Sequence, residues 1–194
     1  MRQTKHLLLA VLFVLPLFFV ACSDDDDDNG NGLSNHFTYD GETYALDLGF
    51  IMNYGQWWGD GYNFDIFLHS DGIEISDNFM DVTGEGHGIY FEMFSPNEDD
   101  LTPGTYNWDG SDEGNPFTYT WGDIIMDWDF ETDEGTEITF SGGNVEVEKS
   151  GSNYTIRVAV TAEDGKEITA YFRGPLPIYD IEDFWKSDEK VRLF

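Results

Sequence analysis

The chain has 194 residues, and its 39 Asp and Glu against nine Lys and Arg give a formal net charge of -30 at pH 7. A protein of that sign repels phosphate backbones and anionic lipid headgroups, which argues against nucleic acid or a polybasic membrane contact as partners. Every basic residue lies at Arg2, at Lys5 or from Lys149 onward, so the middle of the chain has none. This charge favours cations or neutral molecules as ligands, although it also keeps exported proteins soluble without any ligand.

The first residues have the pattern of a bacterial export signal. Arg2 and Lys5 give a positive start, and residues 7–20 form an apolar run that is too short to span a membrane comfortably. A small residue then precedes Cys22, the only cysteine of the chain. We predict a lipoprotein signal peptide over residues 1–21, a lipid on Cys22 and no transmembrane helix in the mature chain. The alternative is an ordinary cleavable signal peptide with a stray cysteine.

An acidic stretch follows this cysteine directly, because Ser23 is succeeded by five aspartates, Asp24 to Asp28. In these features the chain resembles surface-exposed outer-membrane lipoproteins of the Bacteroidota type, in which such a stretch accompanies transfer to the outer leaflet. The resemblance implies a lipid-anchored protein on the cell surface, held to the outer membrane. Residues 22–35 are too polar to bury anything and predict an acidic flexible tether. We expect a single domain over residues 36–194.

Apolar and polar side chains alternate with a period of two along much of this domain, which predicts strands with one face in water. The pattern is clearest over residues 62–68, 124–130 and 154–160. Asp-Gly pairs, which favour tight hairpin turns, occur at residues 40–41, 60–61, 71–72, 109–110 and 164–165. The firmest local prediction is a three-stranded meander of Asn144–Glu148, Tyr154–Thr161 and Glu167–Arg173. A short terminal helix is expected between Asp180 and Lys190.

These elements predict an all-β fold, an antiparallel β-sandwich of about ten short strands, with a lipocalin-like closed β-barrel as the alternative. The segments Phe37-x-Tyr39-Asp40-Gly41-x-x-Tyr44 and Leu101-x-x-Gly104-x-Tyr106, with the closing meander, resemble all-β surface lipoproteins of the same bacterial group. That resemblance rests on turn and core residues, so it implies an architecture and no catalytic residue.

Motifs of the common enzyme classes are missing from the sequence. There is no Gly-x-Ser-x-Gly elbow and no phosphate-binding glycine loop, so we predict no catalytic residue from motifs. No metal site is assigned, because His36, His69 and His87 lack the spacing of zinc ligands and are expected to be exposed strand residues. Calcium is the one cofactor considered, with the acidic loops at residues 97–100 and 111–115 as candidates.

A Trp-Gly-Asp element occurs twice, in Trp57-Trp58-Gly59-Asp60 and in Trp121-Gly122-Asp123. A tryptophan ring stacks on the apolar face of a sugar while a neighbouring carboxylate accepts hydrogen bonds from its hydroxyls. We therefore predict Trp57, Trp58, Asp60, Trp121 and Asp123 as ligand-binding residues. The alternative is that these rings cap the ends of the β core.

Three functions stay open on this basis. The leading one is a non-catalytic surface module that binds a neutral glycan or a similar extracellular ligand, and surface lipoproteins of this type often serve glycan uptake. The others are a structural or adhesive surface module and a hydrolase of unrecognised type. If this protein binds a glycan, we expect at least one of Trp57, Trp58 and Trp121 to be exposed on a concave or flat face near Asp60 or Asp123.

Overall fold

The computed structural model describes residues 34–56, 59–76, 81–111 and 113–181. The predicted signal peptide, Cys22, nearly all of the tether, Trp57 and Trp58 lie outside these ranges. Strands dominate the described part of the chain, so the all-β prediction is confirmed. Within these ranges no helix has the length and apolar character needed to cross a bilayer.

The described residues form twelve strands, whose lengths range from three to 17 residues. In chain order they are β1 (His36–Tyr39), β2 (Glu42–Ala45), β3 (Leu48–Gly55), β4 (Tyr62–His69), β5 (Ile73–Ile75), β6 (Val82–Ser95), β7 (Gly104–Trp108), β8 (Thr118–Asp129), β9 (Glu134–Ser150), β10 (Asn153–Ala162), β11 (Glu167–Pro175) and β12 (Ile178–Asp180).

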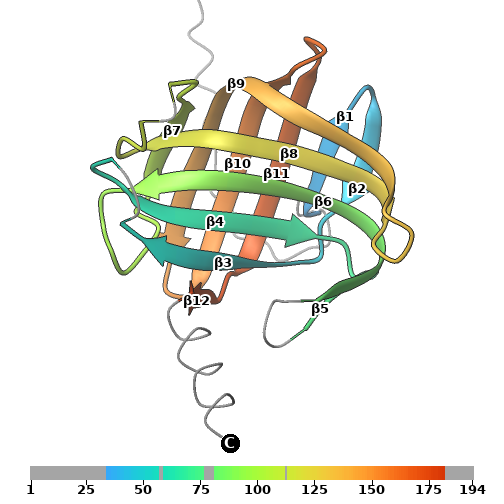
Figure 1. The fold of residues 1–194 in the computed structure, drawn as a ribbon, viewed down its shortest axis with the longest axis horizontal. Helices are drawn as coiled ribbons and strands as arrows, with labels where there is room; N and C mark the ends of the chain where they lie inside the picture. The colour runs from blue at the N-terminus through green and yellow to red at the C-terminus, as the bar shows by residue number, and fades with distance from the viewer. Residues whose placement is uncertain (1–33, 57–58, 77–80, 112, 182–194) are drawn as a thin grey trace, which may run out of the picture. The chain divides into compact units, whose positions relative to one another are not determined.

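The strands form one folded sheet in the order β12-β3-β4-β6-β8-β7-β9-β10-β11-β1-β2, with β5 paired to β6. Figure 1 shows β3, β4, β6 and β8 side by side in a front layer, while β10, β11 and β1 lie behind them and run across their direction. The end strands of this order, β12 and β2, are not paired with each other among the described residues, so the sheet is open. The prediction of a sandwich-like fold is thus confirmed, and the closed barrel is not observed.

Strand β9 joins the two layers because it changes partners along its length. Its residues up to Thr139 pair with β8, its residues from Phe140 onward pair with β10, and residues 144–147 also pair with β7. Gly143 has a φ of 103°, in the region that favours glycine, and it lies where the strand turns into the rear layer. A single long strand therefore makes the corner of the sandwich.

The core lies between the layers and is filled by the alternating apolar positions. In β4 the inward side chains of Phe64, Ile66 and Leu68 are fully buried, and in β10 Ile156 and Val160 are buried opposite them in the same core cluster. Burying each aliphatic side chain of this size contributes about 1.5–3 kcal/mol. The strand pattern predicted over residues 62–68 and 154–160 is therefore confirmed.

The predicted meander is also confirmed, since β9, β10 and β11 pair antiparallel in sequence. The Asp-Gly pairs at residues 40–41 and 164–165 connect paired antiparallel strands, as expected. Two other Asp-Gly pairs do not connect strands that pair with each other. Residues 71–72 join β4 to β5, which pairs with β6, and residues 109–110 follow β7, which pairs parallel to β8.

An Asp-Gly pair favours only a local reversal of the chain. Which strand the next one pairs with depends on the sheet edge it can join and on the apolar face it must bury. A second parallel pair places β12 along β3. Asp180 ends β12, and the helix expected from Asp180 to Lys190 lies almost wholly outside the described residues.

Candidate ligand-binding face

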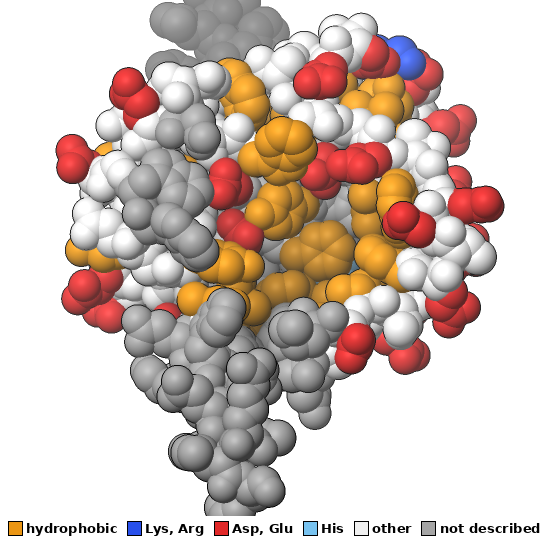
Figure 2. Space-filling model, viewed as in Figure 1, with side chains coloured by type: hydrophobic (Ala, Val, Ile, Leu, Met, Phe, Trp, Pro, Cys, Tyr) orange, Lys and Arg blue, Asp and Glu red, His pale blue; other side chains and the backbone are white. Residues whose placement is uncertain are grey.

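The outward side of the front layer brings aromatic and acidic side chains together. In β4, β6 and β8 these side chains alternate with the buried core residues, and the strand register sets them in two rows. One row contains Asp65, Glu92 and Trp121 and the next contains Phe67, Tyr90 and Asp123. We call this surface the outer face. Figure 2 shows it as a hollow lined with hydrophobic side chains and surrounded by acidic ones.

Trp121 is the most exposed aromatic side chain of the outer face, with 48% of its surface accessible. Its indole Nε1 donates a hydrogen bond of 3.0 Å to Oδ2 of Asp123, two residues along the same strand. The hydrogen bond fixes the orientation of the ring while about half of the residue's surface stays accessible to water. Exposing a large aromatic ring to water is unfavourable. The position of this ring therefore indicates a role other than packing in the core.

An open cavity of 430 Å³ lies beside this ring and is lined by Tyr90, Glu92, Thr120 and Trp121. The register between β6 and β8 shifts between Glu92 and Met93, which leaves Thr120 as an extra residue. Such a bulge redirects side chains. Here the Thr120 hydroxyl donates a 2.6 Å hydrogen bond to Oε2 of Glu92, so the carboxylate is held at the cavity.

Asp65 is the most strongly perturbed carboxyl group of the outer face. Its pKa is raised to about 7, chiefly by burial and also by the charge of Glu92. Its oxygens accept hydrogen bonds from the Tyr90 hydroxyl at 2.7 Å and from Nδ2 of Asn63 at 3.4 Å, which oppose that rise. Near neutral pH this group therefore carries its proton part of the time.

Asp123 shows the same behaviour more weakly. Burial raises its pKa to about 6, while the hydrogen bond from Trp121 lowers it and the charge of Glu137 raises it. No Lys or Arg occurs in the sequence of β3, β4, β6 or β8, so these carboxyl groups have no basic neighbour on their own layer. Such groups can both donate and accept hydrogen bonds with hydroxyl-bearing ligands.

The five predicted ligand-binding residues are placed differently. Trp121 and Asp123 are in direct contact on β8. Asp60 is exposed in the turn before β4, where the neighbouring Gly61 N–H donates to the carbonyl of Gly114. Trp57 and Trp58 lie outside the described residues, so their prediction is untested.

Sequence reasoning missed four residues of this site, namely Asp65, Tyr90, Glu92 and Thr120. A signal was present for three of them, because Asp65 alternates with buried apolar residues in the segment 62–68, as do Tyr90 and Glu92 in the segment 88–93. The signal for a shared site was absent, because it depends on which strands are neighbours.

His69 and Asp100, two residues considered as possible metal ligands, each contact other groups of the protein. His69 was expected to be exposed but is 95% buried: it stacks on Phe67, with 5.3 Å between ring centroids, and its Nδ1 is 2.8 Å from the carbonyl oxygen of Ser70. Burial lowers its pKa, so the ring is kept neutral.

In the loop proposed for calcium, the carboxylate of Asp100 contacts Lys149 and Tyr154 instead. Among the described residues, no three or more His, Cys, Asp and Glu side chains form a group able to hold a metal ion.

Comparisons with protein-family models, with curated proteins and with solved structures find no match to this chain. The function is therefore argued from the geometry of the outer face.

Proposed function

We propose that this protein is a lipid-anchored cell-surface module that binds a neutral glycan on its outer face. The observation that carries the proposal is the ring of Trp121, half exposed, held by Asp123 and bordered by Glu92 at an open cavity. An aromatic ring in this setting offers an apolar platform to a pyranose, and the carboxyl groups offer hydrogen bonds to its hydroxyls. A ring that only capped the core would be expected to bury more of its surface.

The proposal includes a location on the cell surface. The export signal, Cys22 and the acidic tether of residues 22–35 favour attachment to the outer leaflet of the outer membrane. A protein in that place meets polysaccharides and other uncharged polymers. The acidic surface agrees with a ligand that lacks phosphate or sulfate groups.

A glycan array probed with the mature chain tests the proposal, followed by titration of the glycans that bind. We expect Trp121→Ala to weaken binding tenfold or more, since loss of one stacking contact costs about 1 kcal/mol and its hydrogen bond to Asp123 also positions that carboxyl group. Trp121→Phe is the comparison variant: it keeps an aromatic ring but loses the hydrogen bond to Asp123, so its affinity should fall between those of wild type and Trp121→Ala. Trp58→Ala tests the predicted residue that the structure does not describe.

Thermal melts of the variants must show that the fold is intact, which the exposure of Trp121 favours. Binding of a glycan that is indifferent to Trp121→Ala would refute this site. Failure to bind any glycan would refute the function and favour the structural or adhesive alternative.

A hydrolase is the second candidate, and one observation favours it. Asp65 and Glu92 are opposite each other on neighbouring strands, and the pKa of Asp65 is raised to about 7. Glycosidases use two carboxyl groups, one protonated and one ionised, and their environments separate the two pKa values. Appearance of new reducing ends during incubation with a bound glycan, abolished in Asp65→Asn, would assign this activity. Unchanged glycan would leave binding as the function.

A further inference from the structure

Aromatic side chains continue from the Trp121 cavity across the neighbouring strands. Tyr90 of β6 is opposite Phe67 of β4, and Phe67 is opposite Phe50 of β3. The ring centroids of Phe50 and Phe67 are 5.9 Å apart, and those of Phe50 and Tyr179 of β12 are 6.4 Å apart. We call Trp121, Tyr90, Phe67, Phe50 and Tyr179 the aromatic row. It crosses five consecutive strands of the front layer on one face.

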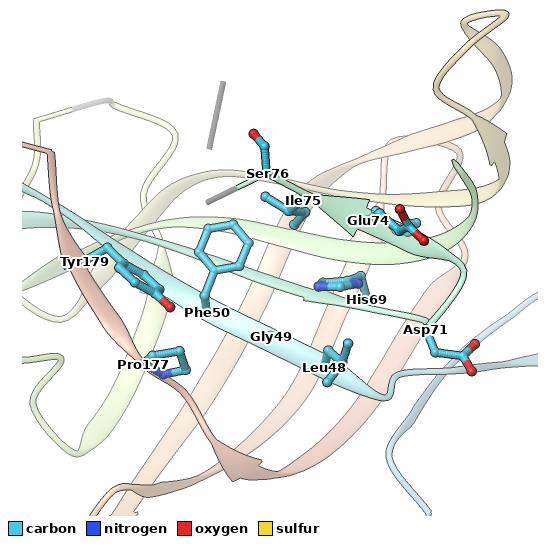
Figure 3. Close-up of a pocket in the computed structure, with 11 residues that line it drawn as sticks. Leu48, Gly49, Phe50, His69, Asp71, Glu74, Ile75, Ser76, Pro177 and Tyr179 are labelled. Atoms are coloured by element: carbon cyan, nitrogen blue, oxygen red, sulfur yellow. The ribbon is translucent and has the colours of Figure 1, made fainter. Parts of the chain in front are cut away.

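A second open cavity, of 640 Å³, lies at the far end of the aromatic row. Its apolar side is formed by Leu48, Phe50 and Tyr179, and Figure 3 shows Glu74 and Ser76 on the side of β5 facing them across the opening. Leu48 is 53% exposed and Tyr179 is 36% exposed. Exposed large apolar side chains beside polar ones are typical of a ligand-binding groove.

The row has the length of a chain molecule. Four steps between adjacent strands separate β8 from β12, and at about 4.8 Å for each step they span about 19 Å. A single sugar ring at Trp121 cannot reach the second cavity over this distance. A ligand that uses both cavities must therefore be extended and must lie across the strands.

The charge, backbone pairing and side chains of the aromatic row favour one class of extended ligand over the others. The strands that form it contain no Lys or Arg, so a polyanion would be repelled. Strands β3, β4, β6 and β8 are each paired with neighbours on both sides, so an extended peptide lying over these four strands finds no strand edge to pair with. The row reaches an edge strand only at β12, which is three residues long. Ring faces interspersed with Asp65, Glu92 and Asp123 instead match the apolar faces and hydroxyl edges of successive pyranose units.

From these observations we propose that the aromatic row binds a linear, uncharged oligosaccharide of several pyranose units, which extends from the Trp121 cavity to the Tyr179 cavity. The inference rests on the proposed function and deepens it, because it specifies a chain where that function requires only a sugar.

The test is affinity as a function of ligand length. The mature chain is titrated with cello-, malto-, manno- and xylo-oligosaccharides of one to six units. In at least one series we expect affinity to rise tenfold or more between two and five units and then to level off. In that series Tyr179→Ala should lower the affinity for the long ligand to that of the disaccharide, and leave disaccharide binding at Trp121 unchanged.

Two further variants guard against misfolding as an explanation. Leu48→Ala removes another exposed side chain of the second cavity and should have the same selective effect. Tyr171→Ala changes a tyrosine of β11, in the rear layer, and should leave affinity at every length unchanged.

The outcomes separate this inference from the function on which it rests. Sugar binding that requires Trp121 but does not increase with length would overturn the inference and leave the function standing. Binding in none of the series would overturn the inference, and the function as well if the array is also negative. Oligolysine bound as tightly as the best sugar would overturn both, because the ligand would then be a cationic peptide.

Discussion

At the scale of single residues, the outer face is unusual in keeping carboxyl groups partly buried without basic partners. Asp65 has its hydrogen bonds from Tyr90 and Asn63, yet burial still raises its pKa to about 7. Ionising this group inside the folded domain is therefore unfavourable. Near neutral pH a partly protonated Asp65 can donate a hydrogen bond as well as accept one, which is compatible with the proposed contact with sugar hydroxyls.

The raised pKa of Asp65 predicts how stability changes with pH. Between about pH 4 and pH 7 the folded state keeps the proton that the unfolded state releases, so this residue makes the protein less stable as pH rises. Asp65→Asn cannot ionise, and its amide oxygen can still accept from Tyr90. We expect the variant to gain roughly 2–4 kcal/mol over wild type between pH 4 and pH 8.

Urea unfolding at several pH values measures this difference. Asp60→Asn is the matched control, because Asp60 is exposed in a turn and its variant should follow wild type. Parallel stability curves for wild type and Asp65→Asn across this range would show that Asp65 does not carry a raised pKa.

The sequence predicted one contact of the site and missed the rest for a physical reason. Trp121 and Asp123 are two residues apart, so any strand places them on one face, and the Trp-Gly-Asp element was sufficient to select them. Asp65 and Glu92 are 27 positions apart and meet only because β4 pairs with β6 in that register. Strand order and register depend on the packing of the whole domain, which local alternation does not encode.

At the scale of elements, the same limit applies to the fold. Alternation and turn residues predicted the strands of β4 and β10 and the meander of β9 to β11. They did not predict that β9 extends back to Glu134 and serves both layers, because the segment 134–143 contains few apolar residues to mark it as a strand. The corner depends on backbone freedom at Gly143, and two adjacent glycines were the only local sign of it.

This corner gives a sharp prediction about stability. A Cβ at Gly143 would lie 2.4 Å from the carbonyl oxygen of Ala159 and 2.5 Å from Cα of Val160, on a backbone whose φ is 103°. Gly143→Ala should therefore destabilise the domain by about 2 kcal/mol or more. Gly142→Ala is the matched control, since nothing lies within 4 Å of its Cβ position and its cost should stay within about 0.5 kcal/mol. Denaturant midpoints compare them, and equal midpoints would exclude Gly143 as the required corner.

At the scale of the whole molecule, the two layers differ in charge. The basic residues of the described strands lie on β9, β10 and β11 or the turn between them, where Lys149 pairs with Asp100, Arg157 with Glu148 and Lys166 with Asp40. The front layer carries none by sequence. These ion pairs thus lie in the rear layer and its turns, while the carboxyl groups of the outer face accept hydrogen bonds from Tyr90, Thr120 and Trp121.

The same charge determines how the protein can be held at a membrane. An acidic domain is repelled by anionic headgroups, so the proposed attachment to a membrane depends on the predicted lipid on Cys22. We expect Cys22→Ser to release the protein into the soluble fraction with an unchanged thermal midpoint, because the first strand begins only at His36. Mass spectrometry of the mature wild type should find a lipid on Cys22, and protease added to intact cells should remove the domain. A free thiol at Cys22, or a domain that resists protease until the cells are broken, would contradict a surface anchor and leave the outer face without access to external glycans.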